Sequence, residues 1–333
     1  MSNPSGPKAY TIGWICALST EFTAAGEQFD QEYKRDESPK RIDRNDHNAY
    51  RFGKIEGHLV VIAVLPNGQY GTSSAAAVAK DMMRSFPNIR FGLMVGIGGG
   101  VPTEKRDIRL GDVVVSSPEA GQSGVFQYDF GRATKEGYQY RGSLNKPPQV
   151  LLAAVAKLKS QFEAESNQIA ASVDTIVENK PRLKAKYGRP DDPDLLFAPS
   201  IGHRNDPCHE FCVTAPTNLI DRTPRSELLE EDVSVHYGII ASGNTLMQDV
   251  NKRDELAKAN ILCFEMEAAG LMDGFPCLVI RGICDYCDSH KNDKWQGYAV
   301  MTAAVYAKQV LGEIRPEDIR MEETVISKMN EGE

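Results

Sequence analysis

The chain has 333 residues, of which 41% are hydrophobic and 25% charged, and 46 acidic against 38 basic residues give a formal net charge of −8. A globular chain of this length buries a large core without disulfides or metal ions. The acidic balance argues against a protein that coats nucleic acid or an anionic membrane, although it permits a small ligand.

The N-terminal residues MSNPSGPKAY lack the charged start and the apolar stretch of a secretion signal. The longest apolar run, at 59–65, is far shorter than the ~20 residues of a membrane helix. Seven cysteines, an odd number scattered through apolar segments, indicate reduced thiols. We therefore expect a soluble cytoplasmic protein with no nucleic-acid or membrane partner.

Secondary structure can be predicted from short apolar runs and from helical spacing. Runs bounded by glycine, proline or polar residues predict strands at 10–18, 59–65, 91–97, 112–116, 237–241 and 277–283. Apolar residues three and four apart predict helices at 72–86, 150–162, 264–272 and 298–311. Because strands alternate with helices, we expect an α/β fold with a central sheet.

We place one domain at residues 8–312. Residues 32–48 are charged and predict a surface excursion, and residues 178–232 form a long, proline-rich, irregular insertion of the kind that is functional or mobile. Residues 313–333 are charged and poor in aromatics, so we expect a flexible tail.

Residues 95–101 read VGIGGGV and directly follow a predicted strand. A dinucleotide fingerprint needs glycine where Val101 stands, and no Lys-Ser/Thr pair follows, so both common nucleotide-binding loops are excluded. The segment is either a tight turn between packed strands or a backbone rim that approaches a ligand closely because it lacks side chains.

Several carboxylates each admit a structural and a catalytic interpretation. Glu21 follows the first strand, either as an ordinary first-turn acid or as a base that positions water. Glu265 and Glu267 lie in an apolar helical pattern, where they either favour the helix dipole or accept paired sugar hydroxyls. Asp285 ends a predicted strand, where open α/β sheets bind ligands, and is either a loop cap or a general acid that burial protonates.

Two groups of cysteines suggest metal or redox chemistry only weakly. His203, Cys208, His209 and Cys212 are metal-ligand types, but Cys-x3-Cys with an internal histidine is not a common zinc pattern. Cys284 and Cys287 form Cys-x-x-Cys without a thioredoxin-like helix start. We expect no metal and no cofactor.

Five segments resemble, in order and approximate spacing, motifs of the nucleoside phosphorylase/nucleosidase superfamily. Glu21 falls where its nucleosidases carry an acid after the first strand, and residues 96–99 resemble their glycine-rich turn. Residues 241–244 (ASGN) resemble a Ser-Gly-Asp segment with Asn244 in place of Asp. The resemblance extends from residue 10 to residue 311.

The remaining motifs lie in the C-terminal half. Residues 265–268 (EMEA) resemble the ribose-binding Met-Glu-Ala motif. Residues 281–285 (RGICD) resemble Arg-x-x-Ser-Asp, with Cys284 replacing serine. Residues 287–292 (CDSHKN) and 295–298 (WQGY) resemble the fungal branch.

The resemblance implies a single α/β domain with a twisted central mixed sheet flanked by helices, a homo-oligomer, and a purine nucleoside bound at the strand ends. Glu267 would accept the 2′ and 3′ hydroxyls, Asp285 would hydrogen-bond or protonate purine N7, and Glu21 would activate water. The other binding residues that we expect are Gly98, Gly99, Ser242, Asn244, Leu246, Met247, Phe264 and Met266, with the base against the backbone near Leu246 and Met247.

These residue types suit cleavage of an N-glycosidic bond, which develops positive charge on the sugar and negative charge on the base. We therefore expect a purine nucleoside N-ribohydrolase that releases base and ribose. The closest alternative is a phosphate-dependent phosphorylase, which needs cationic donors where this chain has Glu21 and Met94. A non-catalytic nucleoside sensor is the alternative from another class, and it would not require three carboxylates.

Overall fold

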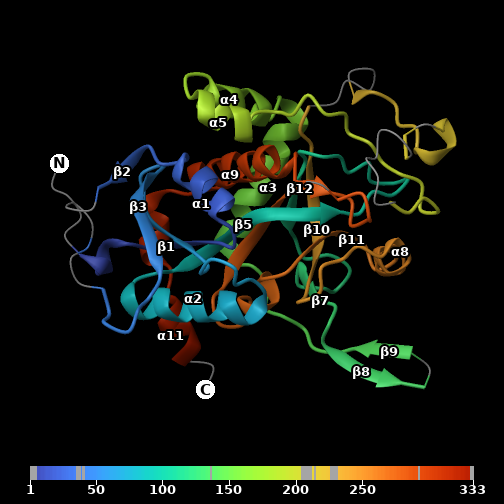
Figure 1. Cartoon of the computed structure of the whole chain (residues 1–333). Coiled ribbons are helices and arrows are strands. Elements are labelled where there is room, and N and C mark those ends of the chain that lie inside the picture. Colours follow the sequence, from blue (N-terminus) through green and yellow to red (C-terminus); the bar gives the residue numbers. More distant parts are fainter. Residues whose placement is uncertain are drawn as a thin grey trace.

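A ten-stranded mixed sheet runs through the centre of the protein (Figure 1). The structure is a computed structural model that describes residues 6–34, 39, 42–135, 137–203, 212–213, 215–225, 232–291 and 293–330. In the order β11-β10-β6-β12-β5-β1-β4-β3-β2, neighbouring strands are hydrogen-bonded, and β7 pairs with β10. Because β11 also pairs with β5, the five strands β11, β10, β6, β12 and β5 close into a ring. The strand bounds are β1 Ile12–Cys16, β2 Gln31–Tyr33, β3 Ala49–Ile55, β4 His58–Val64, β5 Phe91–Gly100, β6 Val113–Ser116, β7 Val125–Gln127, β10 Val235–Ser242, β11 Ile261–Glu265 and β12 Cys277–Asp285.

Helices cover both faces of the sheet (Figure 1). One layer is centred on α9, whose residues are buried on nearly all sides, as expected of a helix that is apolar all round. Helix α2 packs on the opposite face, where Met82 and Phe86 join a second core cluster. The helix bounds are α1 Ser19–Gly26, α2 Thr72–Ser85, α3 Gln149–Ala164, α4 Ile169–Val177, α5 Pro181–Tyr187, α8 Val250–Ala257, α9 Gln296–Gly312, α10 Pro316–Met321 and α11 Val325–Asn330.

The hairpin of β8 Gly131–Thr134 and β9 Gly137–Tyr140 projects from the body of the protein (Figure 1). Its strands are largely exposed. In the described part of the chain, no helix is both long and apolar enough to cross a bilayer.

The α/β prediction with a helix-flanked central sheet is confirmed, and each of the six predicted strands is present. The helices predicted at 72–86, 150–162 and 298–311 are also present, as α2, α3 and α9. The helix predicted at 264–272 is wrong, because the chain there ends strand β11 and then forms a short 3-10 turn, Ala268–Gly270. Strand β11 is buried throughout between β10 and β5, and continuous burial produces an apolar run without strict alternation.

The glycines at 96–99 lie inside β5 and not in a turn, since β5 stays paired with β12 as far as Gly99. The expectation of a flexible tail is also corrected over 316–330, where Ile319 and Val325 are fully buried and α10 and α11 pack on the domain. The Val325 amide donates a 2.9 Å hydrogen bond to the Ile89 carbonyl oxygen.

The two irregular segments are partly described. Within the insertion 178–232 the chain forms α5 and a 3-10 turn, Pro216–Asn218, and Phe197 forms a β-bridge with Leu219. Residues 204–211, 214 and 226–231 lie outside the described residues, as do 35–38, 40 and 41 of the charged segment 32–48.

Strands β1, β5 and β12 are parallel to one another, so their carboxyl ends meet at one edge of the sheet. In open α/β sheets this edge is where ligands bind. It gathers residues that lie far apart in the sequence: the loop after β1, the glycines of β5 and Asp285 at the end of β12.

Candidate active site

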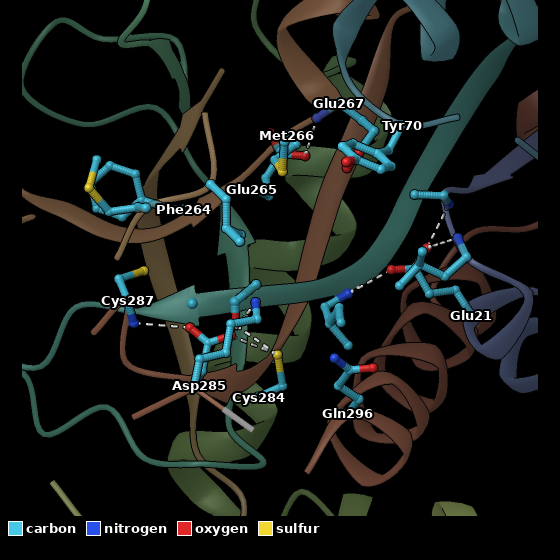
Figure 2. Close-up of a pocket in the computed structure, with 18 of the residues that line it drawn as sticks. Glu21, Tyr70, Phe264, Glu265, Met266, Glu267, Cys284, Asp285, Cys287 and Gln296 are labelled. Carbon is cyan, nitrogen blue, oxygen red and sulfur yellow. Dashed lines mark hydrogen bonds and ion pairs between the residues drawn. The ribbon is translucent and has the colours of Figure 1, made fainter. Parts of the chain in front are cut away.

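A cavity of about 250 Å³ opens at this edge of the sheet (Figure 2). Glu21, Glu267 and Asp285 lie on different sides of it. The cavity is lined by Ala17, Leu18, Glu21, Tyr70, Ile97, Gly98, Gly99, Thr245, Leu246, Met247, Phe264, Glu265, Met266, Glu267, Cys284, Asp285, Cys287, Lys291 and Gln296. The structure thus brings together nine of the eleven residues that the sequence suggested, all except Ser242 and Asn244.

Glu21 lies in the first turn of α1 and is held by backbone amides on two sides. Its Oε2 accepts hydrogen bonds from the amides of Ala17 (2.6 Å) and Leu18 (3.0 Å), and its Oε1 accepts one from Ile97 (3.0 Å). Burial raises the pKa of Glu21, and attraction to Arg281 and these three amides opposes the rise. Glu21 is thus a fixed, buried carboxylate with increased proton affinity, as suits a general base.

Glu267 follows the carboxyl end of β11 and is also buried. Its Oε1 accepts a hydrogen bond from the Gly71 amide at 3.2 Å, and its Oε2 lies 3.6 Å from Arg281 Nη2. Burial raises the pKa of Glu267; Arg281 opposes this rise, and Glu265 and Glu21 add to it. The remaining acceptor capacity of the carboxylate faces the cavity.

Arg281, in the middle of β12, is the positive charge that these carboxylates share. Its side chain is 1% exposed and forms an ion pair with Glu265, whose oxygens also accept the amides of Glu267 and Ala268 at 3.1 Å. Burial opposes the charge on Arg281, but Glu265, Glu267 and Glu21 outweigh burial and raise its pKa. Three carboxylates against one guanidinium leave the group with a formal charge of −2 when all are ionised.

Asp285 stands at the end of β12, across the cavity from Glu21. Its Oδ1 accepts the Cys287 amide at 2.9 Å, and its Oδ2 lies 2.9 Å from Lys291 Nζ. Burial works against the charge of Lys291, but Asp285 more than compensates, so the pKa of Lys291 is raised. Asp285 and Lys291 thus form an ion pair at the wall of the cavity.

The glycines of β5 let these charged groups approach one another. A Cβ at Gly96 would collide with Glu21 Oε1 and Arg281 Nη1, and one at Gly99 would collide with Cys287 Sγ. The glycines therefore lie in a strand and not in a tight turn, and their missing side chains leave room for Glu21, Arg281 and Cys287. The close approach of this backbone to a ligand stays a prediction.

The other walls of the cavity are apolar. Phe264 packs edge-to-face on Tyr128 with ring centroids 5.4 Å apart, and Met247 is buried beside it. Tyr70, which precedes α2, lies near Glu267 at the cavity wall and is 62% exposed (Figure 2). A flat apolar ring would fit between such walls, and the polar side chains that line the cavity would fix the orientation of the ring.

Ser242 and Asn244 do not line the cavity, and both support nearby structure. Ser242 is fully buried, and its Oγ accepts the Ala269 amide at 2.8 Å. Asn244 Oδ1 accepts the amide (3.0 Å) and the hydroxyl (3.1 Å) of Thr72, which begins α2. Both therefore position the segments that carry Glu267 and Tyr70.

Sequence reasoning assigned no role to Arg281 or Lys291, although both stand in the motifs at 281–285 and 287–292, and it missed Tyr70 and the inward position of Glu265. A buried arginine within an otherwise apolar strand, at 277–283, was an available signal, because such a charge requires a carboxylate partner. Lys291 and Tyr70 lie in loops whose contacts are not encoded by any local pattern. Cys284 and Cys287 are reduced, and burial raises the pKa of both thiols, so neither is poised for redox chemistry.

No protein-family model matches the chain. A curated relative from Hyaloscypha variabilis, named "Nucleotide-binding leucine-rich repeat (NLR)-like protein", is 42% identical over 315 residues. The match covers 94% of this chain and 30% of the relative, so the chain spans less than a third of that protein's length.

Solved structures with a similar fold include two nucleosidases and a hydrolase. The 5′-methylthioadenosine/S-adenosylhomocysteine nucleosidase of Neisseria meningitidis, in complex with methylthio-immucillin-A, is 16% identical with a TM-score of 0.57, covering 91% of this chain and 99% of its own. The futalosine hydrolase of Helicobacter pylori is 15% identical with a TM-score of 0.57, covering 92% and 99%. The nucleosidase of S. pneumoniae, bound to a transition-state inhibitor, is 17% identical with a TM-score of 0.57, covering 92% and 100%. The chain is therefore a single α/β domain with the fold of these nucleosidases.

Proposed function

We propose that the protein hydrolyses the N-glycosidic bond of purine nucleosides and belongs to the nucleoside phosphorylase/nucleosidase superfamily. The observation that carries the proposal is the convergence of Glu21, Glu267 and Asp285 on one cavity with an apolar wall between them. The similarity of the fold to nucleosidase structures supports the same reaction class.

The ribose fits the side of the cavity that holds Glu21 and Glu267. The C1′–N9 bond breaks with positive charge developing on the sugar ring, and the ionised carboxylates around Arg281 outnumber its single positive charge. Carboxylates fixed before the reaction stabilise such a charge without reorganising. Glu267 would accept hydrogen bonds from the 2′ and 3′ hydroxyls, and Met266 would lie against the ring.

The purine fits the side that holds Asp285, with Phe264 and Met247 against its faces. As the glycosidic bond breaks, its electron pair goes to the base, and Asp285 passes a proton to N7. The Lys291 ammonium, 2.9 Å from Asp285, offsets the negative charge that remains on that side. General acid–base assistance of this kind is worth ~10²–10⁴ in rate.

Water would be the nucleophile, with Glu21 taking its proton as its oxygen bonds to C1′. A phosphate dianion would require cationic donors at this place, but Arg281 is already paired with carboxylates, and Lys291, the cation that lines the described cavity, lies beside Asp285. A carboxylate at the nucleophile's position repels phosphate. These contacts favour hydrolysis over phosphorolysis.

A second candidate is a nucleoside-sensing module in a larger signalling protein. It is favoured by the 42% identical relative, which is named NLR-like and is about three times as long as the matched region. A sensor would bind nucleosides without turnover.

The test is turnover of adenosine, inosine, guanosine and methylthioadenosine by the purified chain, measured as release of free base. We expect turnover of at least one of them, its abolition in Glu21→Ala, and retained nucleoside binding in that variant. The matched control is Glu27→Ala, at the end of the same helix. It removes only an ion pair with Lys180 and should retain activity. Binding without turnover of any of the four nucleosides would support the sensor instead.

A further inference from the structure

A second cluster of reactive side chains lies outside the cavity described above, at a neighbouring pocket that Asp285 also lines. His203 and Cys212 belong to the insertion 178–232, and His290 belongs to the loop after β12. One donor atom from each lies within 4.8 Å of the other two. The Cys212 Sγ and His203 Nδ1 atoms are 4.0 Å apart, and the rings of His203 and His290 are 5.6 Å apart between centroids.

His290 is the observation that points to a ligand. His290 is only 7% exposed, yet neither of its ring nitrogens has a hydrogen-bond partner among the described residues. Leaving a buried donor or acceptor unsatisfied costs about 1–3 kcal/mol. Phe197 stacks on the ring at 3.7 Å with an interplanar angle of 10°, which fixes the plane in which the nitrogens point.

We propose that His203, Cys212 and His290 bind a zinc ion. Zn–S and Zn–N bonds of ~2.3 and ~2.0 Å at a tetrahedral angle place sulfur and nitrogen about 3.6 Å apart, close to the observed 4.0 Å. A thiolate with two imidazoles suits zinc better than magnesium or calcium, which prefer oxygen ligands. The described residues supply three ligands, and a water molecule can take the fourth position of the tetrahedron.

Asp288 supplies the outer contact that zinc-bound histidines usually have. Its Oδ2 lies 3.7 Å from His290 Nδ1. A small shift of the ring would turn Nδ1–H toward this carboxylate and leave Nε2 for the metal, the arrangement that fixes the tautomer of metal-bound histidines.

The expectation of no metal came from the local spacing of Cys208 and Cys212, and Cys208 and His209 lie outside the described residues. In the structure one of the three proposed ligands, His290, comes from the loop after β12, far from Cys212 in the sequence. No local spacing can reveal such a ligand. The zinc ion would join the insertion to the loop after β12. That loop also carries Lys291, the partner of Asp285, so the metal would set the position of this ion pair.

The test is the metal content of the purified full chain, by mass spectrometry after gel filtration, together with cobalt substitution. We expect about one zinc per chain and, in the cobalt form, the charge-transfer absorption of a cobalt–thiolate bond. Cys212→Ser should remove that absorption and His290→Ala should lose the zinc. His47→Ala, at an exposed histidine outside the cluster, should keep one equivalent.

Because a ligand variant can fail to fold, the wild-type chain provides an independent measurement. Removing zinc with a chelator should lower the melting temperature, and adding zinc back should restore it. Less than a tenth of an equivalent after zinc loading, or a cobalt spectrum without thiolate absorption, would overturn the proposal. Both outcomes are independent of whether the protein hydrolyses nucleosides.

Discussion

Replacing Arg281 with methionine should destabilise the protein severely, because it leaves Glu21, Glu265 and Glu267 without their common counter-charge. All four side chains are buried, and Arg281 is 1% exposed. Removing one partner of a buried ion pair costs about 3–5 kcal/mol. At roughly 2 °C per kcal/mol for a chain of this size, the melting temperature should fall by about 6–10 °C.

The assay is thermal unfolding followed by circular dichroism, at pH 8 and at pH 5. The loss should be smaller at pH 5, because carboxylates that can bind protons no longer need the guanidinium. Arg281→Met combined with Glu265→Gln should recover part of the stability. Arg315→Met is the control, since it removes an exposed, solvent-screened pair with Asp318 and should leave the melting temperature close to that of the wild type. A fall of less than about 2 °C for Arg281→Met would refute the charge balance described here.

Three further predictions concern the carboxylates. Glu267→Gln should lose most activity without lowering the melting temperature, because it removes a buried charge but keeps the shape; near wild-type turnover would exclude the ribose role. Since burial raises the pKa of Glu267 above its unfolded value, its protonation stabilises the fold at low pH, and that contribution disappears as the pH rises through the raised pKa. The melting temperature of the wild type should therefore decline over this range relative to Glu267→Gln, while activity rises as the carboxylate forms; parallel melting profiles would contradict the shift. Asp285→Asn should reduce turnover more than binding and should affect p-nitrophenyl riboside much less than a nucleoside; equal losses on both substrates would make Asp285 structural.

The sequence predicted the parts of the site that depend on local patterns. The six strands have clear apolar runs, and the candidate site residues at the ends of β1 and β12 follow from the way parallel strands align. The amino-acid pattern alone is therefore enough to place Glu21 and Asp285 at one edge of the sheet.

The parts that were missed depend on contacts between distant segments. The apolar run of β11 is compatible with either a buried strand or a helix, and only its pairing with β10 and β5 decides. Arg281 and Glu265 form an ion pair although they lie on different strands. The Ser242 hydroxyl accepts a hydrogen bond from the Ala269 amide and does not line the cavity. Such orientation is set by tertiary packing, which periodicity in one segment does not contain.

The most direct test of the account is the identity of the sugar released from a purine nucleoside in phosphate-free buffer and in buffer with phosphate. Because the proposal places the Glu21 carboxylate beside the nucleophile, where it would repel phosphate, we predict free ribose and free base, formed at the same rate in both buffers. Strict phosphate dependence, with ribose 1-phosphate as the product, would contradict the assignment of water as the nucleophile.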